Sequence, residues 1–597
     1  EIDQLIADYI SSFSSGKTPS SAIRFCAGIM IENAVFKQET GQQSDAFNDY
    51  TRIIEMLEMA NIADSRHSSF NDKLNLATAF MNRGNVHRDL KPSDNEAALV
   101  DYFTGVEMKE KLLDTATDEI KLHVMSDLAI GYRNIANALK DTKYHDIEEA
   151  NSLNSLKKKL RIPPEKSRAT WINRLIRTLE HLSLQTENPC STQWKHELAS
   201  ALIARADFND RNQRNARMVT PIPEWVDQVR DSCLKDLDAA IEQLNSLMSK
   251  DVNKASLKTD FAWAHAMRAR VLGKTSSIEA YDAKEDLEIA IEIWRNAHQS
   301  AQNISCWLEA CSQKVTLLAL QDRFEEALLF GLDTLDKRFS LLHETKDLEL
   351  REALLIGGDK LPQTVAIILN RLARPMEALE TVYKHLGIRH SLDRQSIISH
   401  ERLPLMSLAP NRGAVVVPVV TEDASTLFIF DGDGKIETLD FGYWIDNNTK
   451  VMSLMTLVAS DSLLGGADTA TNLHLLERSL SIAMSSLWRQ IVEPVWKVLD
   501  EKMRIPRDSP ITFITQGILD YFPLHAAARE IDGHWRFAIE DRVIRYAPTL
   551  QTLNTMKVRA STSPSGLCIA GFFDPLGDLP SSREVELREI ASVVTPS

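Results

Sequence analysis

Three side chains near the C-terminal end of the chain have the types needed for nucleophilic chemistry: His525, His534 and Cys568. A cysteine peptidase needs a thiolate and a nearby histidine that lowers the pKa of the thiol and protonates the leaving amine. Cys568 lies in the apolar run Leu567-Cys-Ile-Ala570, which favours a buried and inert thiol, and His534 lies in a turn. The chain therefore contains no recognisable pair of nucleophile and base.

A second group of charged residues copies protein-kinase motifs. His87-Arg-Asp-Leu-Lys-Pro92 matches the catalytic-loop phrase, and Asp440-Phe-Gly442 matches the magnesium-binding phrase. However, the asparagine that should hold the second magnesium is one place late, at Asn95, and no glycine-rich loop or Val-Ala-Ile-Lys strand is found. We therefore expect residues 87–92 to form a turn between two helices.

Two glycine-containing stretches imitate phosphate and calcium sites. Ser14-Ser-Gly-Lys-Thr18 ends like a P-loop, but Ser11 replaces the first glycine and no buried strand leads into it. Asp431-Gly-Asp-Gly434 lacks the later ligands of a calcium loop. Because β-rich runs flank it on both sides, it is predicted to be the turn of a β-hairpin. The sequence indicates neither a metal nor a cofactor.

The elements that would position His525 alternate between strand and helix. The predicted order is a strand at Ile511–Thr515, a break at Gly517, a helix near His525–Ala528, a turn at Asp532-Gly533 and a strand at Val543–Tyr546. A helix is then expected after Pro548, with Thr549 as its N-cap. Such alternation is typical of an α/β sheet.

Strand patterns replace helical ones near residue 412. Ala414–Val420 and Leu427–Phe430 predict a β-hairpin over residues 412–445, and Val451–Leu464 and Leu473–Leu499 predict a helical pair over residues 451–500. Residues 511–597 complete the expected α/β portion.

Four motifs in this region resemble the CHAT family of caspase-like cysteine peptidases, which commonly follow tetratricopeptide (TPR) repeats. The positions that carry the resemblance are Gln516, Gly517, Pro523, Leu524 and His525, then Tyr546 and Pro548, then Pro575, then Glu584. The resemblance covers roughly residues 414–594. It implies a caspase-like sheet with helices on both faces, and it implies that His525 is structural.

The resemblance also implies where catalysis would occur. In the family the catalytic histidine and cysteine come from two later strands that end in His-Gly and Ala-Cys steps, and nothing here matches either. We therefore expect the pair to lie C-terminal to Ser597, so that the CHAT domain is incomplete in residues 412–597.

Residues 1–405 read as successive helices, with apolar residues at spacings of three and four. A phrase of acidic, small and apolar residues recurs around Ala98, Ala150, Ala240, Ala290, Ala327 and Ala378. This resembles TPR repeats, although the separations of 52, 90, 50, 37 and 51 residues exceed the usual period of about 34. The alternative is a non-repetitive helical domain. An array would present a concave face to a peptide or partner domain.

Composition narrows the class of protein further. The formal net charge is −16, which gives no overall electrostatic footprint for nucleic acid or an anionic membrane. Six scattered cysteines suggest neither a disulfide framework nor zinc. With no membrane-spanning run and no basic-then-apolar leader, we expect a cytoplasmic protein.

These features support a leading hypothesis and two alternatives. The first is a regulated cysteine endopeptidase that cleaves a protein substrate while the array binds a protein partner. Residues 516–527 are similar to the protease subunit of RNA-guided CRISPR effectors, and bacterial antiphage proteases share the layout, which would imply an RNA-guided effector as partner. The second is a non-catalytic interaction scaffold with a vestigial peptidase domain. The third is a helical regulator with an unrelated α/β ligand-binding domain.

Overall fold

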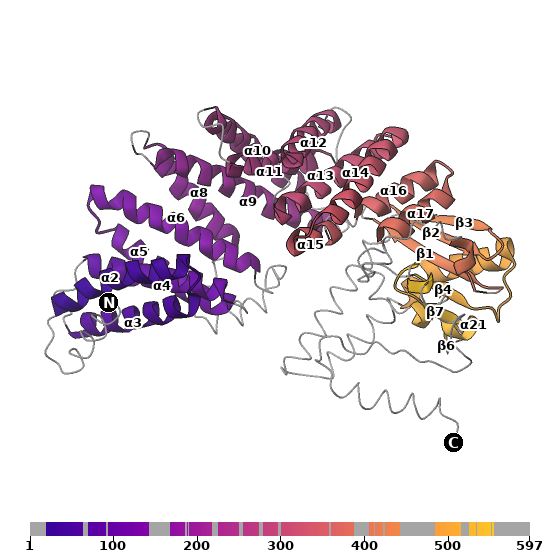
Figure 1. Ribbon diagram of the computed structural model, residues 1–597, viewed down its shortest axis with the longest axis horizontal. Helices are drawn as coiled ribbons and strands as arrows, with labels where there is room; N and C mark the ends of the chain where they lie inside the picture. Colours follow the sequence, from indigo (N-terminus) through magenta and orange to yellow (C-terminus); the bar gives the residue numbers. More distant parts are fainter. Residues whose placement is uncertain are drawn as a thin grey trace, which may run out of the picture. The chain divides into compact units, whose positions relative to one another are not determined.

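The structure is a computed structural model of residues 1–597. It describes residues 20–63, 70–90, 94–141, 168–185, 188, 190–217, 225–249, 255–273, 279–296, 300–356, 360–386, 405–410, 412–421, 424–441, 481, 484–514, 524–532, 534–550 and 552–554. The chain separates into two compact units, Glu1–Ile368 and Leu369–Ser597. The first unit is helical, and the second contains a mixed sheet (Figure 1).

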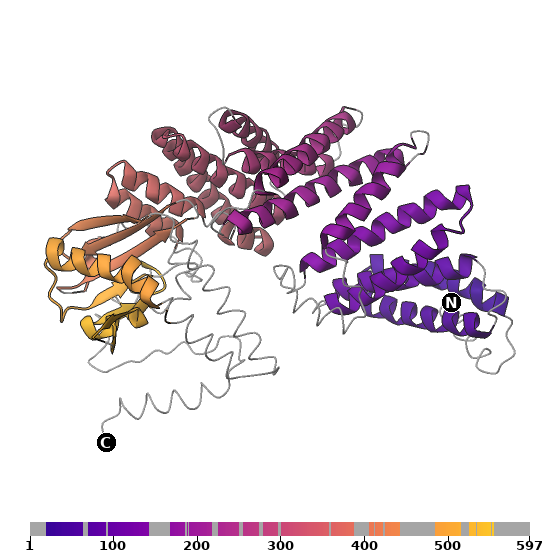
Figure 2. The ribbon, with the colours of Figure 1, turned by 180° about the vertical axis from the view of Figure 1, so that it is seen from behind.

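Helices of the first unit pack as successive pairs, seen from opposite sides in Figures 1 and 2. The pairs are α2 (Ser20–Glu39) with α3 (Gln43–Ala63), α4 (Phe70–Asp89) with α5 (Asn95–Leu113), α6 (Asp118–Asp141) with α8 (Arg168–Ser183), α9 (Ser191–Arg217) with α10 (Trp225–Met248), α11 (Ala255–Leu272) with α12 (Glu279–Arg295), and α13 (Ala301–Leu320) with α14 (Phe324–Glu344). The second helix of each pair packs on the first helix of the next pair, so the pairs form a continuous stack. Two shorter helices follow, α15 (Leu348–Ile356) and α16 (Lys360–Arg371).

Small residues stand where paired helices cross. Of the alanines that the sequence singles out, Ala98, Ala240, Ala290, Ala327 and Ala378 are all fully buried, as the close approach of paired helices requires, and Ala150 lies outside the described residues. A side chain no larger than a methyl group lets the two backbones approach closely. Long helices, such as α6 and α9 with 24 and 27 residues, contribute to the separations between these alanines, and α15 and α16 lie between Ala327 and Ala378.

Three pairs share a register that ties their two helices together. In the first helix, two buried alanines precede an arginine by six and four residues: Ala77, Ala79 and Arg83 in α4, Ala199, Ala201 and Arg205 in α9, and Ala262, Ala264 and Arg268 in α11. In the second helix, buried small residues flank an aspartate at −3 and +4: Ala98, Asp101 and Gly105 in α5, Cys233, Asp236 and Ala240 in α10, and Ala283, Asp286 and Ala290 in α12.

Each of these arginines forms a bidentate ion pair with the aspartate of its partner helix. In the Arg83–Asp101 pair, Nε and Nη2 of the arginine each lie 2.7 Å from a carboxylate oxygen. The corresponding distances are 2.8 and 2.7 Å between Arg205 and Asp236, and 2.8 and 2.7 Å between Arg268 and Asp286. The remaining Nη1 contacts the second helix of the preceding pair, through Thr51, Asn173 and Asp238 respectively. One arginine thereby fixes three helices.

The second unit contains a five-stranded sheet of order β3-β2-β1-β4-β7. Its strands are β1 (Ala414–Val420), β2 (Ser425–Asp431), β3 (Ile436–Phe441), β4 (Ile511–Phe513) and β7 (Ile544–Tyr546). β1, β2 and β3 form an antiparallel meander, whereas β4 runs parallel to β1 and β7 runs parallel to β4. A separate hairpin joins β5 (Ala528–Ile531) to β6 (His534–Phe537) and is followed by the short helix α21 (Ala538–Asp541).

The central strands are buried on both faces. One face, which includes Val416, Ile429 and Phe513, packs against a helical segment at residues 484–503. The opposite face, which includes Val417 and Phe428, is equally inaccessible to solvent. The helical segment is α20 (Glu493–Lys497) between two π-helical turns, Trp488–Val492 and Val498–Met503. Helix α17 (Pro375–Leu386) belongs to this unit and contacts β3.

The strands predicted at Ala414–Val420, Leu427–Phe430, Ile511–Thr515 and Val543–Tyr546 are present, with bounds that differ by one or two residues. Asp431-Gly-Asp-Gly434 forms the β2–β3 turn, with Gly434 at a φ of +91°. Thr549 caps the next helical turn, because its Oγ1 accepts from the Thr552 N–H at 3.0 Å. The helical pair predicted at residues 451–500 is described only from residue 481 onward, and there it is helical.

The helix predicted near His525–Ala528 is wrong. A single 3₁₀ turn, Leu524–Ala526, leads directly into β5. Alanine runs favour helices in isolation, but the sheet hydrogen bonds and the burial of Ala527 and Ala528 outweigh that preference here. Within the part of the chain that the structure describes, no helix combines the length and apolarity needed to cross a bilayer.

Replacing Asp286 by asparagine should destabilise the helical unit by about 3 kcal/mol, because it leaves the Arg268 guanidinium with a neutral partner in a buried site. The side chain of Asp286 is 2% exposed, and Arg268 and His265 both bond to it. The measurement is the urea midpoint of the first unfolding transition at pH 7. The matched control is Asp238→Asn, which removes a 61%-exposed partner of the same arginine and should cost less than about 1 kcal/mol.

The destabilisation caused by Asp286→Asn should depend on pH in a defined direction. Burial opposes ionisation of Asp286, but hydrogen bonds from His265 and Arg268 outweigh it and lower its pKa. A carboxylate whose pKa is lower in the folded chain stabilises fully above about pH 4, and this stabilisation disappears as the pH falls through the folded value. The gap between wild type and Asp286→Asn should therefore narrow in acid. Equal effects of Asp238→Asn and Asp286→Asn would contradict the assignment.

Candidate functional site

Four of the residues predicted from the CHAT resemblance lie within the described part of the second unit. Leu524 is fully buried in the core beneath the sheet, His525 is half-buried beside it, Tyr546 ends β7, and Pro548 is exposed just after it. The remaining predicted positions, Gln516, Gly517, Pro523, Pro575 and Glu584, lie outside the described residues, as does Cys568.

The structure brings His525 and Tyr546 together. The backbone N–H of His525 donates to the Tyr546 hydroxyl at 2.8 Å, and Nδ1 of the ring lies 3.1 Å from the same oxygen. Burial raises the pKa of Tyr546, although the N–H groups of His525 and Leu524 partly offset this. The hydroxyl therefore keeps its proton at neutral pH, and its hydrogen bond with Nδ1 orients the imidazole.

In this geometry the role of His525 is structural, because it holds the neighbouring backbone in position. Catalysis would require a thiol within hydrogen-bonding distance of the ring. Between residues 369 and 597 the only cysteine in the sequence is Cys568, which the structure does not describe. Among the described residues, therefore, no cysteine accompanies His525 or His534.

The five described cysteines belong to the helical unit, and most are chemically shielded. Burial raises the pKa of Cys233 to about 12, of Cys306 to about 11 and of Cys311 to about 12. Burial also raises the pKa of Cys26, whereas Cys190 is exposed. Thiols with such values carry almost no thiolate at neutral pH, so they serve packing rather than catalysis.

The turn predicted at residues 87–92 begins later than expected, because residues 87–89 are the last turn of α4, and residues 91 and 92 lie outside the described residues. Asp94 caps the next helix, α5, by accepting from the Ala97 N–H at 2.9 Å. Asp440 lies on β3 and accepts from Thr426 at 2.6 Å and Asn370 at 3.1 Å. The P-loop-like stretch at residues 14–18 lies outside the described residues. No cluster of metal-binding side chains occurs within the described ranges.

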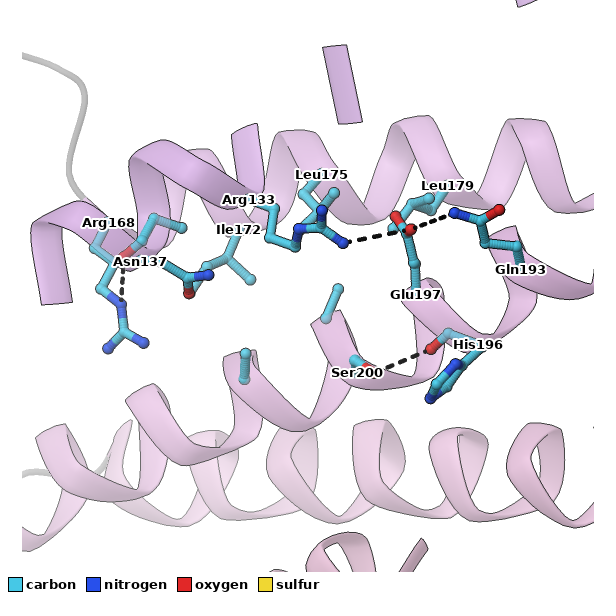
Figure 3. A pocket seen from close by; sticks show the side chains of 13 residues that line it. Arg133, Asn137, Arg168, Ile172, Leu175, Leu179, Gln193, His196, Glu197 and Ser200 are labelled. Carbon is cyan, nitrogen blue, oxygen red and sulfur yellow. Dashed lines mark hydrogen bonds and ion pairs between the residues drawn. The ribbon is translucent and has the colours of Figure 1, made fainter. Parts of the chain in front are cut away.

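A cavity of about 400 Å³ in the helical unit is the better-defined candidate site (Figure 3). It opens between α6 and α9, which are the first helices of adjacent pairs, and α8 forms its floor. Its apolar lining comes from Ala136, Ile172, Leu175, Leu179, Ala201 and Ala204. Elsewhere first helices pack on each other, as α4 does on α2 and α11 on α9.

Polar side chains form the rim of this cavity. Figure 3 shows Arg133 of α6 reaching toward Glu197 of α9, with 3.3 Å between Nη1 and Oε1, and Gln193 donating to the same oxygen at 3.2 Å. Arg168 lies at the opposite end from Gln193, next to Asn137. Its Nε donates to the Ala136 carbonyl at 3.2 Å, and its guanidinium lies 5.6 Å from the Phe208 ring.

Ser200, His196 and Asp260 beside the cavity have the residue types of a hydrolytic triad but the wrong connectivity. Ser200 Oγ donates to Asp260 at 2.6 Å, and His196 Nε2 lies 2.9 Å from the same carboxylate oxygen. A nucleophilic serine must instead give its proton to the histidine. The three side chains therefore link α9 to α11 and do not form a nucleophile.

The cavity was not predicted from the sequence. A signal exists in hindsight, because α6 carries Ile135 where α4, α9 and α11 carry the pairing arginine. That signal becomes visible only once the register of the pairs is known.

Comparison with known proteins adds no family to these observations. No protein-family model matches the chain, and no curated protein matches it significantly.

The shielding of the cysteines predicts a clear order of alkylation. With iodoacetamide at pH 7.5, Cys190 should react first, while Cys233 and Cys311 should react at least about 100-fold more slowly because their thiolate fraction is so low. Mass spectrometry of tryptic peptides over time measures each rate. In denaturant all six cysteines of the chain should react alike. Fast modification of Cys233 in the folded chain would contradict the burial described.

Proposed function

We propose that the chain is the regulatory and N-terminal part of a cysteine endopeptidase. Its helical array is TPR-like and binds a protein partner, and its second unit is the first part of a caspase-like CHAT domain. Partner binding controls cleavage of a protein substrate. The cutting histidine and cysteine come from strands outside the described residues.

The observation that carries this proposal is the parallel arrangement of β1, β4 and β7. Parallel strands place their carboxyl ends at one edge of the sheet, which is where α/β enzymes build their sites. Tyr546 ends β7 at that edge and orients His525 there. In the caspase-like layout further strands would bring their catalytic residues to the same edge, beside β7.

The array supports the regulatory half of the proposal. A stack of paired helices exposes the first helix of each pair along one face, and such faces bind partner segments. The cavity between α6 and α9 interrupts this face with an apolar floor and a charged rim. Such a site suits recognition, because apolar area supplies affinity while a few polar groups set specificity.

A second function, a non-catalytic interaction scaffold, is favoured by one observation. The cavity is fully formed within the described residues, whereas no thiol accompanies His525 there. On this alternative the sheet only anchors the array.

Residues 1–597 alone should not cleave proteins, because the proposed catalytic pair is not among them. The measurement is the incubation of the purified chain with a proteome-derived peptide library, followed by mass spectrometry of new N-termini. The matched control is Cys568→Ala, which should behave identically. Cleavage that Cys568→Ala abolishes would overturn the proposed location of the nucleophile.

A longer form of the protein separates the two functions. If residues after Ser597 contain a cysteine at an Ala-Cys strand end, changing that cysteine to alanine should abolish cleavage of the substrate while partner binding persists. Partner binding without any cleavage by the longer wild-type protein would instead support the scaffold.

A further inference from the structure

The rim of the α6–α9 cavity carries an ion pair whose polar groups are largely unused (Figure 3). Nη1 of Arg133 lies 3.3 Å from Oε1 of Glu197, which also accepts from Gln193 at 3.2 Å. Within the described residues Arg133 makes no other hydrogen bond or ion pair, and Oε2 of Glu197 accepts none. Only 16% of the Glu197 side chain is exposed, so this oxygen is partly shielded from water as well. A guanidinium and a carboxylate therefore line the cavity with groups available to a ligand.

The charges around the cavity balance one another. Arg133 and Arg168 supply positive charge. Glu197 supplies negative charge, and so does Asp260, which accepts from Ser200 at 2.6 Å just behind the lining. A ligand with a net charge would meet a like charge at close range. A zwitterion avoids this cost if its two charges are as close together as those of Arg133 and Glu197.

An α-amino acid carries its charges in this way. Its ammonium and carboxylate groups are bonded to the same carbon atom, so the ammonium can meet Oε2 of Glu197 while the carboxylate meets the unused N–H groups of Arg133. Each charge of the ligand then faces an opposite charge of the protein. A residue within a peptide, or at either end of one, carries at most one of these two main-chain charges. The rim therefore matches a free amino acid better than a peptide segment.

Away from the ion pair the lining is mainly apolar. Ile172, Leu175 and Leu179 of α8 form the floor, and Ala201 and Ala204 of α9 form one side. None of these side chains can hydrogen-bond, so a hydrocarbon group fits here and a polar group would lose its hydrogen bonds to water. A volume of about 400 Å³ lies within the range of small-molecule pockets and accommodates an unbranched side chain of several carbon atoms.

We propose that this cavity binds a free α-amino acid with an aliphatic side chain, held at its head by Arg133 and Glu197 and along its side chain by the floor of α8. This ligand is a small molecule, distinct from the protein partner proposed for the array, and its binding does not require the second unit to be a peptidase. Because the ligand contacts both α6 and α9, which pack little on each other within the described residues, its binding stabilises the helical unit.

The test is isothermal titration calorimetry of residues 1–597 with a homologous series, L-alanine, L-norvaline and L-norleucine. Affinity should rise about two- to fourfold for each added methylene group, because each one buries apolar area on the floor. Hexanoate is norleucine without its ammonium group, and pentylamine is norleucine without its carboxylate. Each of these two analogues should bind at least about tenfold more weakly than norleucine, because each leaves one charge of the rim unmatched.

Two variants that each remove one charge assign the two ends of the head group. Glu197→Gln removes the partner of the ammonium, so it should weaken norleucine binding about tenfold without weakening hexanoate binding. Arg133→Gln should weaken norleucine binding to a similar extent without weakening pentylamine binding. Unfolding would weaken all probes alike and cannot produce this crossed pattern. The matched control is Glu107→Gln, which removes a 66%-exposed partner of Lys111 outside the lining and should change none of these affinities.

A variant that fills the cavity tests its location. Ala204→Trp introduces a large side chain at a half-buried position and should abolish binding of every probe while circular dichroism stays unchanged. If this variant does not fold, the crossed pattern of the two charge variants decides.

Equal binding of norleucine, hexanoate and pentylamine would overturn the proposal, as would binding of none of the three amino acids. Norleucine binding that survives both Arg133→Gln and Glu197→Gln would also overturn it. None of these outcomes bears on the peptidase proposal, because cleavage by the longer protein is measured separately.

Discussion

Three of the helix pairs depend on a half-buried arginine that holds three helices at once. Arg83, Arg205 and Arg268 each pair with an aspartate of the partner helix and also reach the second helix of the preceding pair. Such pairs add little net stability, because burying both charges costs about as much as their attraction returns. What they supply is register: a helix that slipped by one residue would leave a buried carboxylate without its partner, which is strongly unfavourable. The small residues on either side of the aspartate let the two helices approach closely enough to form the ion pair. In α5 one of these residues is Gly105, where an added Cβ would lie 2.7 Å from the Ala77 carbonyl oxygen.

The candidate site lies where this device is missing. In α6 the residues six and four positions before Ile135 are again small, Ala129 and Gly131, so Ile135 takes the position of the arginine, and it is fully buried. The same register places Asn137 where α4 has Asn85, which bonds to Tyr102 at 2.8 Å and Asn134 at 2.9 Å. Asn137 is exposed instead and faces the cavity. An apolar pair packs its own hairpin well but reaches no third helix, so a gap between α6 and α9 is tolerated at this point of the stack.

How much of this the sequence could predict depends on the range of the interactions. Helices, the buried alanines and the turn at residues 431–434 follow from local periodicity and turn chemistry, and all were predictable. The arginine–aspartate pairs were not, because their partners are 18 or 31 residues apart and the separation changes with the length of the loop. The cavity was less predictable still, since it arises from packing between helices whose own sequences are ordinary. The 3₁₀ turn at Leu524–Ala526 was missed because sheet formation in β5 overrode an alanine-rich local preference.

In the second unit, too, a charged side chain fixes how neighbouring segments pack. Arg542, just before β7, is buried and bonds to Asp500 and to the carbonyls of Ile505 and Pro506, and its guanidinium lies 5.6 Å from the Trp496 ring. This fixes β7 against the helical segment that covers the sheet. Since β7 is the last strand of the described sheet on that side, its position determines where Tyr546 holds His525. Through the two hydrogen bonds between His525 and Tyr546, β7 in turn holds the 3₁₀ turn that precedes β5.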